Sequence, residues 1–460
     1  MQTTTVGHAP EPEPESDRGR PVPRPVHPWP LTTVMWLRRP LDYWDELYAR
    51  HGDTFTMKLP AMPPLVVFSN PEVVKQVFAD HGDAMHAGEF NKVLAPFIGD
   101  KSVLMLDGKE HLRHRRILLP PFHGERMQAY GREMLDLTRA EVDRWPVGAP
   151  FGVHEPMQRV TLGVIVRTIF GVEEGPRFDA FVDRLTELTH IASWPPLLLG
   201  PMQVDLGPWS PWGKFQRKAA EVDAALLSEI RRRRHGGTEG RVDVLSLLVD
   251  AKDESGEGMT DEELRDELAT LLVAGHETTA TALAWAFRWV LGTPSVCERL
   301  VAEIRDAAAD GLTAERVSKL EYLDAVVRET LRLQPVIPLV GRILKERMTV
   351  GGYDLPAGTP IACAIYLAHR RPEVYPEPKR FLPERFLGTK FTPSELFPFG
   401  GGIRRCIGMA FALYEMKMVL AEVLSRVSLR LADQRPITVT RRSITLTPSG
   451  GTRVVVDRRL

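Results

Sequence analysis

The sequence predicts a mainly α-helical fold with minor β structure, in which helices form the body and small sheets lie at the periphery. Apolar residues recur with helical spacing from Pro71 to about residue 340. One helical pattern within this range continues for some thirty residues. Short apolar runs typical of strands occur mainly before Pro71 and after Arg342. No linker divides the pattern, so we expect one domain.

The predicted strands form three small units separated by turn residues. These units are residues 54–59 with 65–69, residues 348–350 with 353–355 around Gly351-Gly352, and residues 437–457 around Pro448-Ser-Gly-Gly451. Residues 370–386 are dense in proline and arginine and predict a long irregular segment. A loop of that length is unusual in a compact domain unless it has a function.

The longest helix has clear start and stop signals. Thr260 and Glu263 have the spacing of a capping box, and Gly292-Thr-Pro294 stops the pattern after Leu291. Thirty residues at about 1.5 Å each give roughly 45 Å, which is enough to cross a whole domain.

Composition and charge exclude several classes of protein. The chain has 460 residues and a formal net charge of −1, so no global charge directs it to nucleic acid or to an anionic membrane. Residues 1–27 are rich in proline and glutamate and predict a disordered tail, with a single domain in residues 28–460. The apolar stretch at residues 29–37 is too short to span a bilayer. The three cysteines contain no CxxC pair, which favours a reducing, cytoplasmic location.

The most informative segment surrounds Cys406. Phe399, Gly402, Arg404 and Gly408 flank this cysteine in the pattern Phe-x-x-Gly-x-Arg-x-Cys-x-Gly. Glycines permit close approach to a bulky partner, while Arg404, Arg405 and the start of a helix near Gly408 favour a thiolate. One thiolate without a second cysteine is a poor zinc site but a good axial ligand for haem iron. The alternative interpretation is a buried structural cysteine in a glycine-rich turn.

This pattern resembles the haem-binding loop of the cytochrome P-450 superfamily. The resemblance extends from about Pro28 to Leu460 and implies a cytochrome P-450 type fold with Cys406 ligating the iron of haem b. It also implies a monooxygenase that uses dioxygen as co-substrate. The absence of an N-terminal membrane helix favours a soluble bacterial enzyme, similar to fatty-acid and terpenoid hydroxylases.

The long helix carries a second motif, Ala274-Gly275-His276-Glu277-Thr278-Thr279. A glycine in a helix interior costs about 1 kcal/mol relative to alanine, and a hydroxyl there can bend the helix. We therefore expect a flat ligand to pack against Ala274 and Gly275. The resemblance implies that Thr278 holds dioxygen and water and that Glu277 supplies protons. The alternative is a bent core helix with a solvated glutamate; His276 is left unassigned.

A third motif places Glu329 and Arg332 on one helix face. Such pairs are common on surfaces and contribute little stability there. The resemblance implies that Arg385, in the irregular segment, joins them in a buried structural triad around the haem loop.

The carboxylates of a haem require cationic donors. His111 and Arg115 lie four residues apart on one helix face, and Arg342 and Arg404 are the other candidates. Arg113 and Arg116 are expected on a solvated basic face. Together with Arg405 and Lys417 they form a candidate docking patch for an acidic electron donor.

The resemblance implies a separate ferredoxin or flavodoxin-type electron donor with its reductase, because little chain follows the haem loop. We expect a monomer and a small apolar substrate such as a terpene, steroid or fatty acid. The predicted pocket residues are mostly apolar: Phe90, Val93, Leu94, Val336, Leu339, Val340, Ile444 and Thr445. Each of them has ordinary core packing as its alternative interpretation.

Two other functions share the cysteine loop. A peroxide-driven or isomerising haem-thiolate enzyme needs no electron donor, and the Glu277-Thr278 pair argues against it. A non-catalytic haem-thiolate sensor needs neither a proton relay nor a broad apolar pocket.

Overall fold

The structure is a computed structural model that describes residues 20–460 apart from residues 22, 61, 80, 123, 125, 172–174, 199–201 and 437. The prediction of a disordered tail falls mostly on residues 1–19, which lie outside the described residues. Arg20 forms an isolated bridge with Tyr353, and Pro25 forms one with Thr56, so this part of the predicted tail contacts two strands. The boundary at residue 28 stays a prediction.

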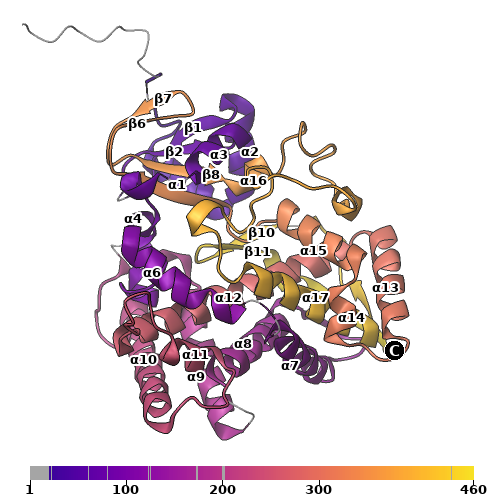
Figure 1. The fold of residues 1–460 in the computed structure, drawn as a ribbon. Helices are drawn as coiled ribbons and strands as arrows, with labels where there is room; N and C mark the ends of the chain where they lie inside the picture. Colours follow the sequence, from indigo (N-terminus) through magenta and orange to yellow (C-terminus); the bar gives the residue numbers. More distant parts are fainter. Residues whose placement is uncertain are drawn as a thin grey trace, which may run out of the picture.

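Helices form the body of the molecule, and a sheet caps the end where the described chain begins (Figure 1). In chain order the helices are α1 (Trp29–Arg38), α2 (Pro40–His51), α3 (Pro71–Phe78), α4 (Ala87–Phe90), α5 (Ala95–Ile98), α6 (Gly108–Leu118), α7 (Arg126–Val142), α8 (His154–Phe170), α9 (Pro176–Ala192), α10 (Pro211–Gly236), α11 (Val244–Asp250), α12 (Asp261–Leu291), α13 (Pro294–Ala308), α14 (Ala314–Ser318), α15 (Glu321–Leu333), α16 (Ile365–Ala368) and α17 (Met409–Arg426).

The strands form several small sheets. They are β1 (Thr54–Met57), β2 (Leu65–Phe68), β3 (Met85–His86), β4 (Pro150–Gly152), β5 (Leu339–Leu344), β6 (Met348–Val350), β7 (Tyr353–Leu355), β8 (Pro360–Ala364), β9 (Val427–Leu431), β10 (Val439–Arg442), β11 (Thr445–Pro448) and β12 (Arg453–Arg459). The largest sheet has the order β1-β2-β8-β5-β3, and β4-β12-β9 forms another. The pairs β6-β7 and β10-β11 are hairpins.

The predicted mainly α fold with small sheets is confirmed. The hairpins β1-β2 and β6-β7 are antiparallel as expected. The prediction of one β unit over residues 437–457 is wrong, because β10 and β11 pair with each other while β12 pairs with β4 and β9. Gly450 and Gly451 both have positive φ and redirect the chain between the two sheets.

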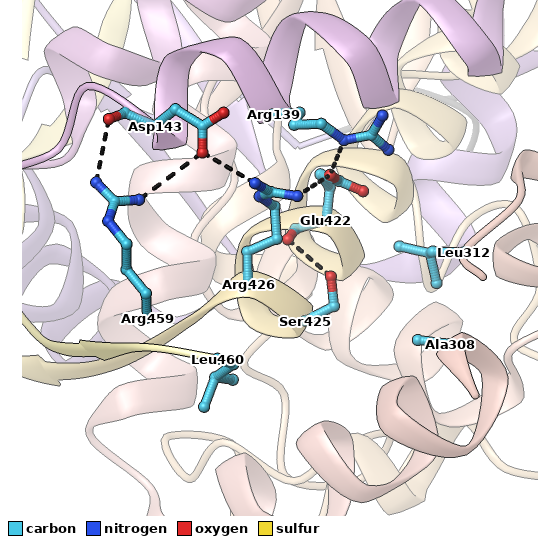
Figure 2. Close-up of a pocket in the computed structure, with 9 residues that line it drawn as sticks. All are labelled: Arg139, Asp143, Ala308, Leu312, Glu422, Ser425, Arg426, Arg459 and Leu460. Atoms are coloured by element: carbon cyan, nitrogen blue, oxygen red, sulfur yellow. Dashed lines mark hydrogen bonds and ion pairs between the residues drawn. The ribbon is translucent and has the colours of Figure 1, made fainter. Parts of the chain in front are cut away.

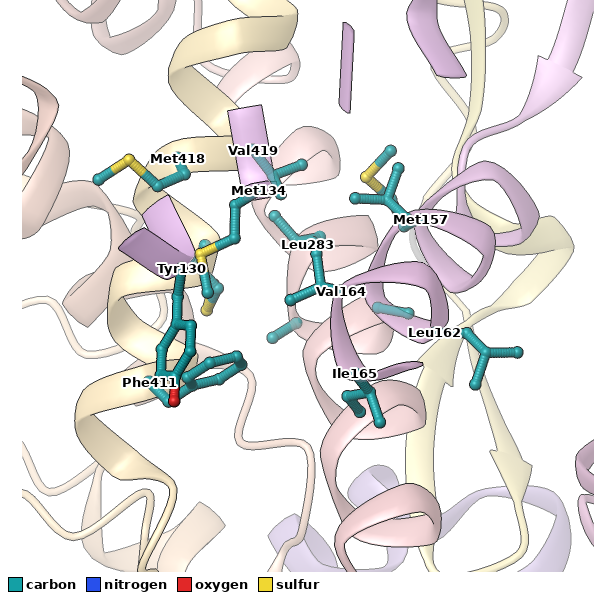
Figure 3. Close-up of a cluster of buried hydrophobic side chains, with 14 of the residues drawn as sticks. Tyr130, Met134, Met157, Leu162, Val164, Ile165, Leu283, Phe411, Met418 and Val419 are labelled. Carbon is teal, nitrogen blue, oxygen red and sulfur yellow. The ribbon is translucent and has the colours of Figure 1, made fainter. Parts of the chain in front are cut away.

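The long central helix α12 begins and ends where its signals predict. The Thr260 hydroxyl accepts a hydrogen bond from Glu263 N, and the Glu263 carboxylate accepts one from Thr260 N. Helices α8 and α17 pack against this helix with apolar side chains, and α7 packs on both of them (Figure 3). Met134, Val164, Leu283 and Val419, one from each helix, are fully buried in this core. The core therefore fixes α12 between α8 and α17.

No helix in the described part of the chain is long and apolar enough to cross a membrane.

The cap of α12 gives a stability prediction. Thr260→Ala removes the acceptor for Glu263 N and should lower the free energy of unfolding by about 1 kcal/mol, measured by urea denaturation at equal cofactor content. Thr260→Ser keeps a hydroxyl and should stay close to the parent protein. Equal losses in both variants would contradict a role for the cap.

Candidate active site

The loop before α17 presents Cys406 at the start of a helix. Cys406 N donates a 3.0 Å hydrogen bond to Phe399 O, which closes the loop, and Gly408 caps α17. A methyl group on Gly401 would lie 2.1 Å from the ring of Phe78 on α3. One on Gly402, where φ is +62°, would lie 2.4 Å from Phe78 O. Close approach to a cofactor is therefore not the whole reason for these glycines, because a side chain at Gly401 or Gly402 would collide with Phe78 of α3.

The arginines that act on the Cys406 sulfur are not the two that the sequence predicts. Cys406 is exposed at the protein surface, yet desolvation by the surrounding loop raises the pKa of its thiol, while the Gly408 N–H and the guanidinium groups of Arg115 and Arg405 oppose that shift. Arg404 is not among these groups. Arg115, from α6, takes the place that the sequence assigned to Arg404.

Arg404 instead ties the loop to the segment before α6. Its guanidinium forms an ion pair with Asp107 and donates to the backbone oxygens of Val103 and Leu106. The Asp107 carboxylate also accepts hydrogen bonds from Ala87 N and Gly88 N, both at 2.9 Å, at the start of α4. Asp107 was not predicted, and it links three segments of the site.

Positive charge is concentrated next to this loop. The pKa of His111 is lowered to about 3 by burial and by the nearby guanidinium groups of Arg404, Arg115 and Arg342, and Asp107 opposes that shift. The His111 Nδ1 atom is buried without a hydrogen-bond partner. The pKa of Arg404 is lowered to about 10, by burial first and then by Arg342 and Arg115. Burying like charges together is costly, so this cluster favours an anionic ligand.

The residues present fit a planar cofactor with two carboxylates and one thiolate ligand. The guanidinium groups of Arg115 and Arg342 and the orphaned nitrogen of His111 supply donors for the carboxylates, and Cys406 supplies the sulfur, whereas Arg404 is already bound to Asp107. The structure therefore brings His111, Arg115, Arg342 and Cys406 to one site.

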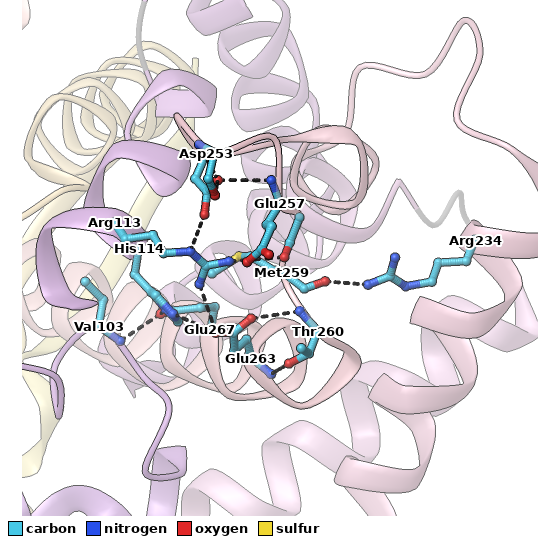
Figure 4. A network of polar contacts seen from close by, with 12 residues as sticks. Val103, Arg113, His114, Arg234, Asp253, Glu257, Met259, Thr260, Glu263 and Glu267 are labelled. Atoms are coloured by element: carbon cyan, nitrogen blue, oxygen red, sulfur yellow. Dashed lines mark hydrogen bonds and ion pairs between the residues drawn. The ribbon is translucent and has the colours of Figure 1, made fainter. Parts of the chain in front are cut away.

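A buried polar network holds α6 against α12 (Figure 4). Arg113 pairs with Asp253 at 2.6 Å and with Glu263 at 2.9 Å, and His114 contacts Glu267 at 2.7 Å. The prediction that Arg113 lies on a solvated basic face is wrong, because its guanidinium binds these acids. Lys417 likewise pairs with Asp324 at 3.3 Å. The candidate docking patch loses these two cations.

On α12, Ala274 and Thr278 lie one turn apart, and the Thr278 hydroxyl donates a 2.6 Å hydrogen bond to Ala274 O. Ala274 is exposed although it lies in the middle of the longest helix. Gly275 has another explanation than a flat ligand, because a methyl group there would lie 2.7 Å from Ile165 Cδ1 on α8. Gly275 therefore permits the close packing of α12 on α8.

The carboxylate of Glu277 is held by groups that the sequence analysis did not identify. Gln158 Nε2 donates to Glu277 Oε2, Arg442 Nε lies 3.5 Å from Oε1, and His154 Nε2 lies 3.7 Å from Oε1. His154 Nε2 also contacts Thr281 Oγ1 at 3.2 Å. The alternative of a solvated glutamate is excluded. These partners come from α8 and β10, and no local spacing relates them to Glu277.

The structure brings Glu329, Arg332 and Arg385 together. Glu329 and Arg332 are both fully buried on α15, and Arg385 Nε lies 3.1 Å from Glu329 Oε1. Arg332 Nη1 donates to the backbone oxygen of His369, at the end of α16, and to that of Pro378 in the irregular segment.

The predicted pocket residues separate into different environments. Phe90 and Leu339 pack against a cluster formed mainly by α2, β1 and β2, whereas Val340 packs against another cluster, which includes Val66 and Phe397. Leu339 and Val340 therefore face different clusters, because successive strand residues point to opposite faces. The Thr445 hydroxyl is not a free polar handle, since it donates to Arg442 O at 2.8 Å.

The remaining predicted pocket residues also differ in exposure. Val93 is exposed, Leu94 and Ile444 are half-buried, and Val336 is buried in the central core.

A surface pocket of about 360 Å³ lies elsewhere, between α7, α17 and the end of the chain (Figure 2). Ion pairs of Arg139 with Glu422 and of Arg426 with Asp143 line it. Neither Cys406 nor Thr278 contributes to this pocket.

The triad gives a second prediction. Glu329→Gln leaves the buried Arg332 without its counter-charge and should lower the free energy of unfolding by about 3 to 5 kcal/mol, measured by urea denaturation. Glu373→Gln is a matched control, because Glu373 is exposed in the same segment and pairs with Arg371. Similar effects of the two substitutions would contradict the importance of the buried pair.

His154 gives a prediction about pH. Burial lowers its pKa to about 4, whereas an unfolded histidine titrates near pH 6.5. Between these values the unfolded chain binds a proton that the folded chain does not, so stability should fall as pH drops from about 6.5 to 4. His154→Gln should flatten that part of the urea-midpoint profile. Identical slopes for parent and variant would contradict this account.

Comparison with known proteins agrees with this site. The family model for cytochrome P450 matches residues 23–455. The putative cytochrome P450 135B1 of Mycobacterium bovis is 38% identical over 428 residues, which cover 93% of this chain and 89% of that protein. The putative cytochrome P450 137 of Mycobacterium tuberculosis is 37% identical over 409 residues, covering 89% and 84% of the two chains.

Solved structures show the same fold. Cyanobacterial CYP120A1 with bound retinoic acid superposes with a TM-score of 0.83 at 25% identity, covering 96% of this chain and all of that chain. The haem domain of cytochrome P450DA gives a TM-score of 0.83 at 26% identity, covering 96% and 98%. The fold, the cysteine loop and these relatives agree, and the chain belongs to the cytochrome P450 family, a family of haem-containing oxidoreductases.

Proposed function

We propose that this protein is a haem-thiolate monooxygenase that inserts one oxygen atom of dioxygen into an apolar substrate. The observation that carries the proposal is the arrangement on α12. The Thr278 hydroxyl lies beside the exposed Ala274, and the adjacent Glu277 carboxylate is held by partners from α8 and β10. When bound, haem supplies the redox chemistry by which dioxygen is activated.

Each residue of the proposed site has a distinct task. When haem is bound, Cys406 would hold the iron, and Arg115, Arg342 and His111 would bind the cofactor carboxylates. Thr278 orients dioxygen and water through its hydroxyl. Glu277 accepts protons from solvent through its polar partners and delivers them on the Thr278 side of the helix. The proposed reaction consumes substrate, dioxygen, two electrons and two protons, and yields hydroxylated product and water.

The electrons come from a separate donor in this proposal. A ferredoxin or flavodoxin-type protein with its reductase would dock near the cysteine loop, where Arg405 is exposed. Arg116 is exposed as well and pairs with the exposed Glu254. These two cations replace the larger patch expected from the sequence. We place the enzyme in the cytoplasm, because its three cysteines are free thiols.

The proposed substrate is a lipid, terpene or steroid. Phe90 and Leu339 supply apolar contacts that suit such a molecule. CYP120A1, which shares this fold, binds retinoic acid, an apolar terpenoid acid. A peroxide-driven or isomerising enzyme has no use for the Glu277–Thr278 pair, and a sensor has none for the polar partners that hold Glu277.

The proposal is tested with a surrogate ferredoxin and reductase under ¹⁸O₂. A panel of fatty acids, terpenes and steroids should include a substrate whose product carries one ¹⁸O atom per hydroxyl group. Product that takes its oxygen from water or added peroxide, with no requirement for electrons, would favour the alternative.

The two α12 side chains give separate predictions. Thr278→Ala should consume electrons without forming product. Thr278→Ser keeps the hydroxyl, and its electron consumption should stay coupled to product formation.

Glu277→Gln should slow product formation on the order of 100-fold, because proton delivery by a positioned group contributes that much. Electron consumption and product are measured together. Full coupling and rate in both Thr278→Ala and Glu277→Gln would exclude these roles.

A further inference from the structure

Arg441, on β10, is a buried cation without a counter-charge. The residue is only 6% exposed, and its Nε and Nη2 atoms are buried without hydrogen-bond partners. No carboxylate in the described part of the chain forms an ion pair with it. The next residue, Arg442, points to the other face of the hairpin and contacts Glu277. The two arginine side chains therefore lie on opposite faces of the hairpin and contact different residues.

The surroundings of Arg441 are aromatic and apolar. Its guanidinium carbon lies 3.6 Å from the ring centroid of Trp36 on α1. Stacking on an aromatic face leaves the N–H groups at the guanidinium edge free to bind an anion. Burial alone lowers the pKa of Arg441 to about 9, and no acidic group opposes that shift.

Arg441 is also next to the proposed substrate region. Leu446, directly opposite Arg441 in the hairpin, belongs to the same apolar cluster as Phe90 and Leu339. Paired residues of a hairpin share a face. Trp36 packs against that cluster as well. One buried cation thus lies at the edge of an apolar cluster that contains two predicted pocket residues.

We propose that Arg441 binds the carboxylate of an apolar carboxylic acid substrate, whose hydrocarbon part lies along Phe90 and Leu339. An unpaired buried charge is costly, and a carboxylate with two oxygens matches the free fork of a guanidinium. A neutral terpene or steroid gives Arg441 no counter-charge. This inference rests on the proposed function and narrows its substrate class from apolar molecules to apolar acids.

The test compares acids with alcohols of the same carbon skeleton. Dissociation constants for tetradecanoic acid and 1-tetradecanol, and for retinoic acid and retinol, are measured by equilibrium dialysis on the haem-loaded protein. On at least one skeleton the acid should bind on the order of tenfold or more tightly than the alcohol. Arg441→Gln should abolish that preference by weakening the acid alone, and Arg441→Lys should keep part of it.

Arg430→Gln is the matched control, because Arg430 is an exposed arginine on β9 that pairs with Asp457, and its substitution should leave the preference intact. Retained alcohol binding by Arg441→Gln shows that the variant is folded. The inference is overturned if the parent protein prefers neither acid. It is also overturned if Arg441→Gln weakens acid and alcohol equally, which indicates a structural role.

Binding is measured without an electron donor, so this result does not depend on turnover. Failure to find an ¹⁸O-labelled product would remove the proposed monooxygenase function while leaving an Arg441-dependent acid site in place.

Discussion

The geometry around Cys406 depends on the hydrogen bonds and ion pairs of the buried Glu329 carboxylate. It accepts hydrogen bonds from Arg332, Arg385 and Leu382 N, so one side chain joins α15 to the irregular segment. Arg332 in turn binds the backbone oxygen of His369, and His369 Nε2 accepts a hydrogen bond from Phe397 N. Phe397 lies two residues before Phe399, whose oxygen closes the cysteine loop. The position of the Cys406 sulfur therefore depends on a chain of buried polar contacts that begins at Glu329.

The proposed functional residues of α12 lie on two different faces of the helix. Thr278 and Ala274 share one face, whereas Glu277 points toward α8 and β10, and Gly275 packs closely on Ile165. The hairpin β10-β11 makes a similar division, since Arg442 contacts the Glu277 carboxylate while Arg441 stacks on Trp36. Two adjacent arginines thereby connect the proposed proton path with the proposed substrate anchor.

Local signals in the sequence were sufficient for the long helix α12 and for the hairpins β1-β2 and β6-β7, whereas α1 and α2 lie before the range in which helices were expected. The capping box at Thr260 and the glycine turn at Gly351 depend on neighbouring residues, and both are where they were expected. The partners of Glu277 could not be predicted, because His154 and Gln158 are more than 100 residues away and follow no motif. The same holds for the roles of Asp107 and Arg441 and for the acids that bind Arg113, because these roles also arise from tertiary contacts.

The most direct test of the account is the difference spectrum of the reduced, CO-bound protein, for the parent chain and for Cys406→Ala. A thiolate from Cys406 as the iron ligand predicts a Soret band near 450 nm, as the cytochrome P450 family implies, and loss of that band in the variant. A parent protein that binds no haem, or a spectrum that Cys406→Ala does not change, would contradict the central claim.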